Sequence, residues 1–216
     1  MSSRGCLLLL FLALAGNANK VSAQTATPQI RVQVQVYDYA GLNPATLHEF
    51  VEGTQAILTG AGVSVQVDAC ARGTAVPCGS PGARNSKRVV IRIHAGAAKR
   101  MNNVRHCPLG LSFAGHDGGT YASVFLEPVK DAAAEANFPW VVVLSYAAAH
   151  EIGHLLLGDQ AHAPRGVMKA NWDANDIRAM AQNRFHFSDE QARELASRYG
   201  TVRPRDIRPD VVQVRP

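Results

Sequence analysis

The chain lacks an apolar run at its N-terminus that is long enough to cross a membrane. The run there, residues 6–15, has ten residues, whereas a spanning helix needs about 20. Arg4 precedes this run, and small residues follow it at positions 21–23, where a signal peptidase reads the chain. We therefore predict that residues 1–23 are a secretory signal peptide, that the mature protein is secreted or periplasmic, and that it has no stable membrane insertion.

The sequence also has little excess charge of either sign. The formal net charge is +5, and it falls by two to +3 when Arg4 and Lys20 leave with the signal peptide. This small excess is spread along the chain, so it gives no reason to expect a nucleic-acid partner. The 193 residues that remain of 216 suffice for one domain. We predict a monomer with one domain over residues 24–200 and a flexible Arg/Pro-rich tail over residues 201–216.

Cysteine is scarce, since only Cys70, Cys78 and Cys107 follow the predicted signal peptide. An exported protein tends to oxidise such residues. A bridge between Cys70 and Cys78 is favoured because it would close the short Gly- and Pro-containing loop between them. Cys107 would then be unpaired, intermolecular or an alternative partner, and the sequence does not determine the pairing.

The most informative feature that is present is the run HEIGHLLLGDQAH, residues 150–162. On a helix, His150 and His154 project from one face, so both imidazoles can reach a single metal ion. Glu151 lies beside them and can deprotonate a zinc-activated water without binding the metal itself, as in HExxH proteases. These residues predict a Zn²⁺ site with Glu151 as general base.

The surroundings of the motif favour a buried helix. Residues 139–157 are nearly all apolar apart from the motif, Ser145 and Tyr146. An ionised Glu151 would be costly there without a cation. Pro139 suits the first turn of this helix, and Gly158 suits the left-handed residue after its C-terminus. A sharp turn at Gly158 would bring His162 back to the metal as a third ligand and leave a fourth position open for water.

The segment resembles the metzincin clan of zinc metallopeptidases, whose pattern is HExxHxxGxxH followed by a methionine turn. Here the motif is stretched to HExxHxxxGxxxH, so that Gly158 and His162 each come later than the clan's pattern has them. Met168 matches the methionine of the turn beneath the metal. Ala170 takes the position where some metzincins have a tyrosine that assists the oxyanion. The resemblance implies a zincin-like fold and peptidase activity.

Other residues are alternatives to His162 as the third ligand, because the motif is stretched. Asp159 directly follows the glycine, and four acids lie further downstream, Asp173, Asp176, Glu190 and Glu194. Cys107 is a further alternative. We favour His162 because imidazole is a good zinc ligand and the loop is short enough to return to the helix.

Hydrophobic periodicity predicts an α+β domain. We expect strands at residues 30–37, 63–67, 88–94 and 120–126, and helices at residues 43–58, 139–157 and 188–199. The resemblance arranges these as an N-terminal mixed β-sheet with a backing helix, an HExxH active-site helix and a C-terminal helical subdomain. Residues 119–126 are the expected edge strand, beside which an extended substrate would pair.

The favoured hypothesis is an exported zinc endopeptidase that acts on a peptide or protein substrate, with zinc bound by His150, His154 and His162. Two alternatives remain at this stage. One is a noncatalytic secreted module with a closed, structural zinc site. The other is a zinc amidase that acts on cell-wall peptides.

Overall fold

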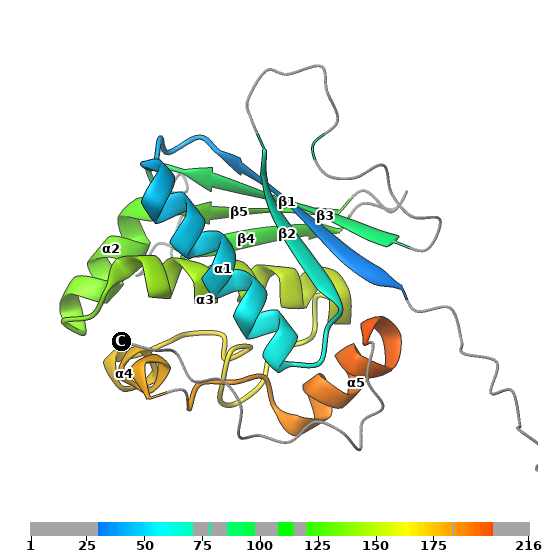
Figure 1. The fold of residues 1–216 in the computed structure, drawn as a ribbon. Coiled ribbons are helices and arrows are strands. Elements are labelled where there is room, and N and C mark those ends of the chain that lie inside the picture. The colour runs from blue at the N-terminus through cyan, green and yellow to red at the C-terminus, as the bar shows by residue number, and fades with distance from the viewer. Residues whose placement is uncertain are drawn as a thin grey trace, which may run out of the picture.

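The structure is a computed structural model, and it describes residues 30–70, 78, 86–97, 108–114, 120–182 and 184–200. These residues form a five-stranded β-sheet and five α-helices, with α3 running beneath the sheet (Figure 1). The prediction of an α+β fold with a mixed sheet is therefore confirmed. The predicted signal peptide and the predicted C-terminal tail lie outside the described residues.

The sheet has the strand order β2-β1-β3-β5-β4, and all strands are parallel except β4. The strands are β1 (Arg31–Asp38), β2 (Val65–Cys70), β3 (Ser86–His94), β4 (Gly110–Ala114) and β5 (Thr120–Phe125). Side chains alternate between the two faces of a strand. In β1 the three buried valines, Val32, Val34 and Val36, are at most 1% exposed and form part of the core. The sheet's apolar face is covered by helices.

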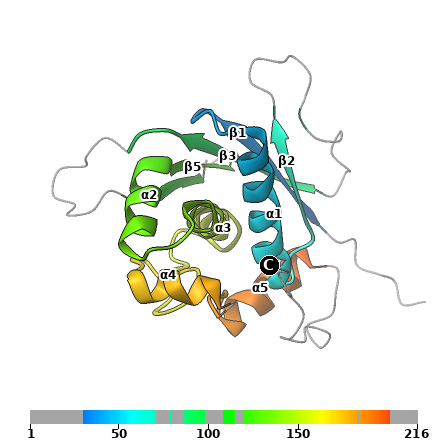
Figure 2. The same ribbon diagram turned by 60° about the vertical axis from the view of Figure 1, so that its left-hand side comes forward.

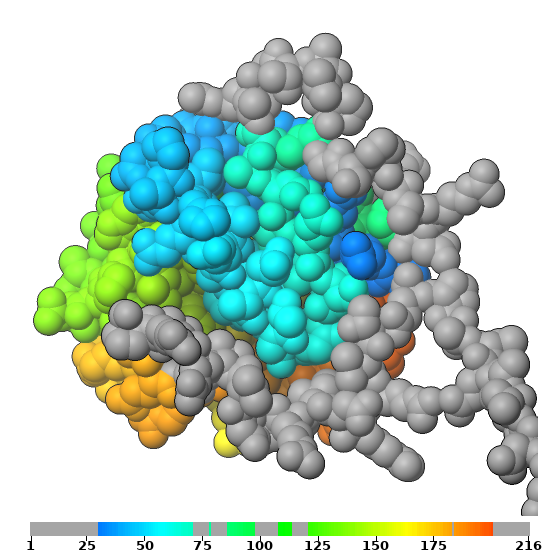
Figure 3. Space-filling view, viewed as in Figure 1, coloured from blue at the N-terminus to red at the C-terminus, as the bar shows by residue number. Residues whose placement is uncertain are grey.

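Two helices flank the sheet's lower face and the central helix. The first, α1 (Pro44–Gly60), begins with Pro44 after the predicted cap Asn43, whose side chain accepts a hydrogen bond from the backbone N–H of Thr46 at 2.9 Å. It connects the parallel strands β1 and β2, and its light-blue and cyan atoms cover much of the face that Figure 3 shows. The second, α2 (Leu126–Glu135), directly follows β5.

The central helix is α3 (Trp140–Leu157), which Figure 2 shows nearly end-on between the sheet and the C-terminal helices. Its mean hydropathy of 1.4 would suit a membrane span, but 83% of it is buried within the molecule. The apolar sequence of α3 is thus explained by burial on nearly all sides. Below it lie α4 (Ala174–Ala181) and α5 (Asp189–Tyr199), each of which begins with a capping box, at Asp173 and Ser188 respectively.

One disulfide joins Cys70 at the end of β2 to Cys78, with the two Cα atoms 5.4 Å apart. This confirms the favoured pairing. Cys107 lies outside the described residues.

The prediction that residues 119–126 form the edge strand of the sheet was wrong. The strand at residues 119–126 corresponds to β5, which lies between β3 and β4, and the edge position belongs to β4. The short sequence GLSFA of β4 has only two large apolar side chains, so it gives too little alternation to predict a strand. The helices α2 and α4 were also not predicted, because Pro128 in the first turn of α2 separates Leu126 from the other apolar residues of that helix and α4 has only eight residues.

Candidate metal centre

Two of the three candidate ligands lie on the last turns of α3. His150 and His154 are one helical turn apart, and their Nε2 atoms lie 3.1 Å from each other. Their rings meet edge to face at a centroid distance of 4.8 Å. The helical spacing therefore places both imidazoles on one side of α3, as the sequence predicted.

The third histidine reaches the same point from the loop that follows α3, residues 158–169, which we call the exit loop. Gly158 ends the helix with φ 106°, a backbone conformation that favours glycine, as predicted. The loop then turns back, and the Nε2 atom of His162 lies 3.1 Å from the Nε2 atom of His154. The ligand atoms of all three histidines lie within 4.8 Å of one another. The three histidines could thus hold one metal ion.

Backbone carbonyls determine which nitrogen of two of these rings faces the cluster. The Nδ1–H of His150 donates to the carbonyl oxygen of Val167 at 2.7 Å, and Nδ1 of His154 makes a longer contact of 3.4 Å with the carbonyl oxygen of Gly158. A carbonyl accepts a hydrogen bond and cannot donate one, so the proton resides on Nδ1. The Nε2 lone pairs are therefore directed at the cluster, as metal ligation requires.

This donor set fits a tetrahedral metal ion. The Nε2 lone pairs of His150 and His154 face each other at 3.1 Å, and they repel unless a cation lies between them. Neither ring has a proton left for a hydrogen bond between them, because both rings carry their proton on Nδ1. With Zn–N bonds of about 2.0 to 2.1 Å, tetrahedral ligand nitrogens lie about 3.3 Å apart. This is close to the 3.1 Å between Nε2 of His154 and Nε2 of each of the other two histidines, and the remaining pair lies within 4.8 Å. Three imidazoles also leave one tetrahedral position for water or substrate.

Burial keeps the helical histidines neutral. Burial is the main cause that lowers the pKa of His150 to about 4; the hydrogen bond to Val167 opposes the shift, and the neighbouring histidines contribute to it. Burial is also the main cause that lowers the pKa of His154. Neutral imidazole is the form that binds metals.

Glu151 follows His150 on α3, and its side chain is held by the edge strand β4. Its side chain is buried, only 7% of the residue is exposed, and burial raises its pKa to about 7 while a hydrogen bond from the hydroxyl of Ser112 opposes the shift. The backbone of β4 passes so close that a Cβ atom at Gly110 would lie 2.6 to 2.8 Å from Cγ, Cδ and Oε1 of Glu151. Gly110 and Ser112, two residues apart on one face of β4, together form a seat for the carboxylate.

Met168 lies in the core beneath α3, at the turn that the sequence analysis identified. It is fully buried, and its Sδ atom occupies the space that a Cβ atom at Gly153 would need. Gly166, two residues earlier, has φ 77°. The glycine inside the HEIGH motif thus lets α3 lie directly on Met168 and Phe187.

Trp172 packs against the cluster from the segment that precedes α4. Its ring meets His150 edge to face at 5.7 Å, and it meets Phe185 at 5.5 Å. Its Nε1 atom is buried without a hydrogen-bond partner among the described residues. Trp172 restricts the orientation of the His150 ring by packing on it.

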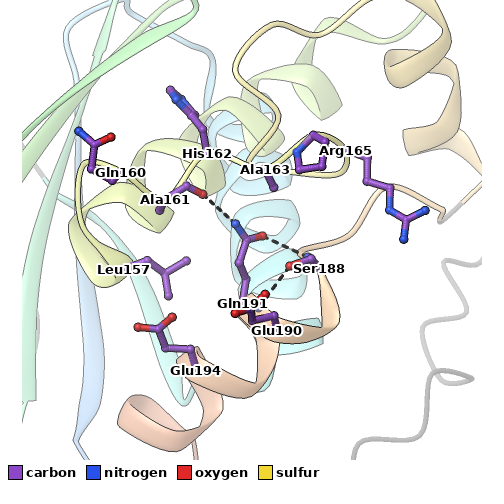
Figure 4. Close-up of a pocket in the computed structure, with 11 residues that line it drawn as sticks. Leu157, Gln160, Ala161, His162, Ala163, Arg165, Ser188, Glu190, Gln191 and Glu194 are labelled. Carbon is purple, nitrogen blue, oxygen red and sulfur yellow. Dashed lines mark hydrogen bonds between the residues drawn. The ribbon is translucent and has the colours of Figure 1, made fainter.

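The alternative ligands are placed elsewhere. Asp159 is exposed and does not belong to the histidine cluster. Asp173 caps α4, and Lys169 forms ion pairs with Asp173 and Asp176. Glu190 and Glu194 do not belong to the histidine cluster; they line a cavity of about 520 Å³ between the exit loop and α5, which His162 also lines (Figure 4).

Three residues near the cluster were not identified from the sequence, namely Gly110, Ser112 and Trp172. The first two lie on a strand that was not predicted, so no signal placed them opposite Glu151. Trp172 could have been considered as a residue near the metal site, because it comes four residues after Met168. Only the fold, however, shows that it contacts His150.

No family model matches the chain, and no curated protein sequence matches it. Among solved structures, metalloproteinase-II from Bacteroides fragilis is similar over 83% of this chain, with 12% identity and a TM-score of 0.46. The chain spans 56% of the length of that protein.

Proposed function

We propose that this protein is an exported zinc endopeptidase in which His150, His154 and His162 bind the metal and Glu151 is the general base. The observation that carries the proposal is the convergence of the ligand atoms of three histidines, together with the buried carboxylate of Glu151, the residue that follows His150 on α3. Imidazole ligands suit zinc, and a site with three protein ligands and an open position is typical of catalytic rather than structural zinc. The disulfide between Cys70 and Cys78 supports export.

The histidines and Glu151 would have different roles in the reaction. When bound, zinc supplies Lewis-acid polarisation of a carbonyl oxygen and lowers the pKa of a water ligand. His150 and His154 present Nε2 because Val167 and Gly158 accept hydrogen bonds from Nδ1. Glu151 takes a proton from the attacking water at a carboxylate oxygen and passes it to the departing amine nitrogen.

The substrate would bind along β4. In the part of the chain that the structure describes, β4 pairs with β5 on one side only. An extended peptide can add to such an edge through main-chain hydrogen bonds. Because Gly110 and Ser112 of this strand contact Glu151, a peptide bond held there would lie close to the general base.

The test is metal analysis of the purified protein together with digestion of a peptide library, with and without a chelator. We expect about one zinc ion per chain and cleavage that the chelator abolishes. The Glu151→Gln variant should keep its zinc and lose at least about 100-fold in kcat/KM, the usual range for a general base.

Two further samples make this test specific. Asp159→Asn should keep both zinc and activity, since the exposed Asp159 lies outside the cluster. Peptidoglycan fragments offered in parallel distinguish an amidase from an endopeptidase. Absence of both zinc and cleavage in the wild type contradicts the proposal, and full activity in Glu151→Gln contradicts the role of that residue.

A further inference from the structure

His162 depends on its loop for its position more than the other two histidines do. Its ring is exposed, and no carbonyl among the described residues accepts a hydrogen bond from its Nδ1 atom. His150 and His154, by contrast, are fixed both by α3 and by Nδ1 contacts. The position of His162 is therefore set by whatever holds the backbone on each side of it.

Three contacts hold the exit loop directly before and after His162, one of which is a hydrogen bond of 3.2 Å from the N–H of Ala161 to the carbonyl oxygen of Gly158 within the loop. After it, the N–H of Ala163 donates to the carbonyl oxygen of Met168 at 2.8 Å, a bond within the loop. Before it, the carbonyl oxygen of Ala161 accepts a hydrogen bond of 2.7 Å from Nε2 of Gln191. The contact from Gln191 ties the loop to α5, a separate element 30 residues further along the chain.

The side chain of Gln191 is itself fixed by the start of α5. Its Oε1 atom accepts a hydrogen bond from the backbone N–H of Ser188 at 3.2 Å, and the hydroxyl of Ser188 accepts one from the backbone N–H of Gln191 at 3.3 Å. Figure 4 shows the amide of Gln191 between Ser188 and Ala161, with one end in the cap and the other at the loop. The helix cap thereby sets the direction of the Nε2 donor.

This geometry distinguishes glutamine from glutamate. Both residues complete a capping box equally well through a side-chain oxygen. Only the amide also donates a hydrogen bond, and a carboxylate would set an oxygen against the carbonyl oxygen of Ala161. The capping box alone gives no reason for an amide at this position, whereas the contact with Ala161 does.

We propose that Gln191 is a positioning residue for the metal centre, which holds His162 in reach of the metal by anchoring Ala161 to the cap of α5. The inference rests on the proposed zinc site. It assigns α5 a part in metal binding, although none of its side chains belongs to the histidine cluster. Contacts of this kind around a metal site typically affect metal affinity about 10- to 100-fold.

The experiment measures the zinc Kd of the full chain by competition with a chromophoric chelator. Gln191→Glu keeps the cap and removes the donor, and we expect zinc to bind about tenfold or more weakly. Gln191→Ala removes the donor without adding a charge and should show the same loss. Glu190→Gln, on the neighbouring exposed residue, is the control, and the double variant Glu190→Gln with Gln191→Glu restores the net charge of the turn.

A double-mutant cycle shows whether Gln191 acts through His162. In the His162→Ala background, Gln191→Glu should have no further effect on the zinc Kd, whereas a general loss of structure would add to the effect. Wild-type zinc affinity in folded Gln191→Glu and Gln191→Ala overturns the inference, and so does failure of both variants to fold with zinc present. If the wild type binds no zinc, the proposed metal centre itself fails, whatever the variants do.

Discussion

At the scale of single residues, His150, His162 and Glu151 are each held by a neighbour from outside the motif. Val167 of the exit loop orients His150, Gln191 of α5 holds the loop of His162, and Ser112 of β4 contacts Glu151. Such neighbours fix the rotamer and tautomer of a functional group before any ligand arrives. The motif supplies the reactive groups, but residues outside the motif determine where they point.

Gly110 gives a test of how finely Glu151 must be placed. A Cβ atom at this position would lie 2.6 Å from Cγ of Glu151, so Gly110→Ala must displace the carboxylate. A displacement of about 1 Å at a catalytic group can cost about 100-fold in rate. We expect Gly110→Ala to lower kcat about 100-fold and to leave KM and zinc content near those of the wild type, as measured by steady-state kinetics and metal analysis.

The control for this substitution is Leu111→Ala. Leu111 is the next residue of β4, and its side chain points to the other face of the sheet. If Leu111→Ala lowers kcat as much as Gly110→Ala does, the effect comes from the strand as a whole and the specific seat for Glu151 is contradicted.

At the scale of elements, the sequence predicted those segments whose pattern is long or whose ends are marked. β1, β3 and α3 have sustained apolar patterns, and α1 and α5 begin with the expected caps Asn43 and Ser188. β4 and α4 were missed because five and eight residues carry too little periodicity. The seat of Glu151 could not be predicted for the same reason, since it depends on the pairing of β4 with β5.

The packing of α3 on its lower side depends on Gly153. A Cβ atom there would overlap Sδ of Met168 and lie 3.1 Å from Cε1 of Phe187, and both residues are buried. Overpacking of this kind costs about 1 to 3 kcal/mol, which exceeds the gain of up to about 1 kcal/mol from alanine in a helix. We expect Gly153→Ala to lower the free energy of unfolding by about 1 to 2 kcal/mol, measured by urea denaturation.

Gly60→Ala is the matched control for this effect. Gly60 is also helical, at the end of α1, and a Cβ atom there has no neighbour within 4 Å. Alanine should therefore be neutral or slightly stabilising at residue 60. Equal losses of stability at both positions would show that contact with Met168 is not the cause.

At the scale of the whole molecule, the cluster connects parts of the chain that are distant in sequence. α3 supplies His150 and His154, the exit loop supplies His162, and α5 holds that loop through Gln191. The sequence indicated that these histidines belong together, but the length of the exit loop left Asp159 as an alternative. Only the folded path of the loop places His162, and not Asp159, beside His154.

A ligand that binds across these parts should stabilise the native state as a whole. A metal that binds only the folded protein adds about 2.7 kcal/mol of stability when its free concentration is 100 times its Kd. For a domain of this size, this corresponds to a rise in Tm of about 5 to 10 °C. We therefore expect zinc to raise Tm by this amount in the wild type and in Glu151→Gln, measured by calorimetry of samples with and without a chelator. His162→Ala should lose most of the rise because it removes a ligand, while His48→Ala should keep it, since His48 is exposed and paired with Glu52. A rise of equal size in His162→Ala would mean that zinc binds elsewhere or that His162 is not a ligand.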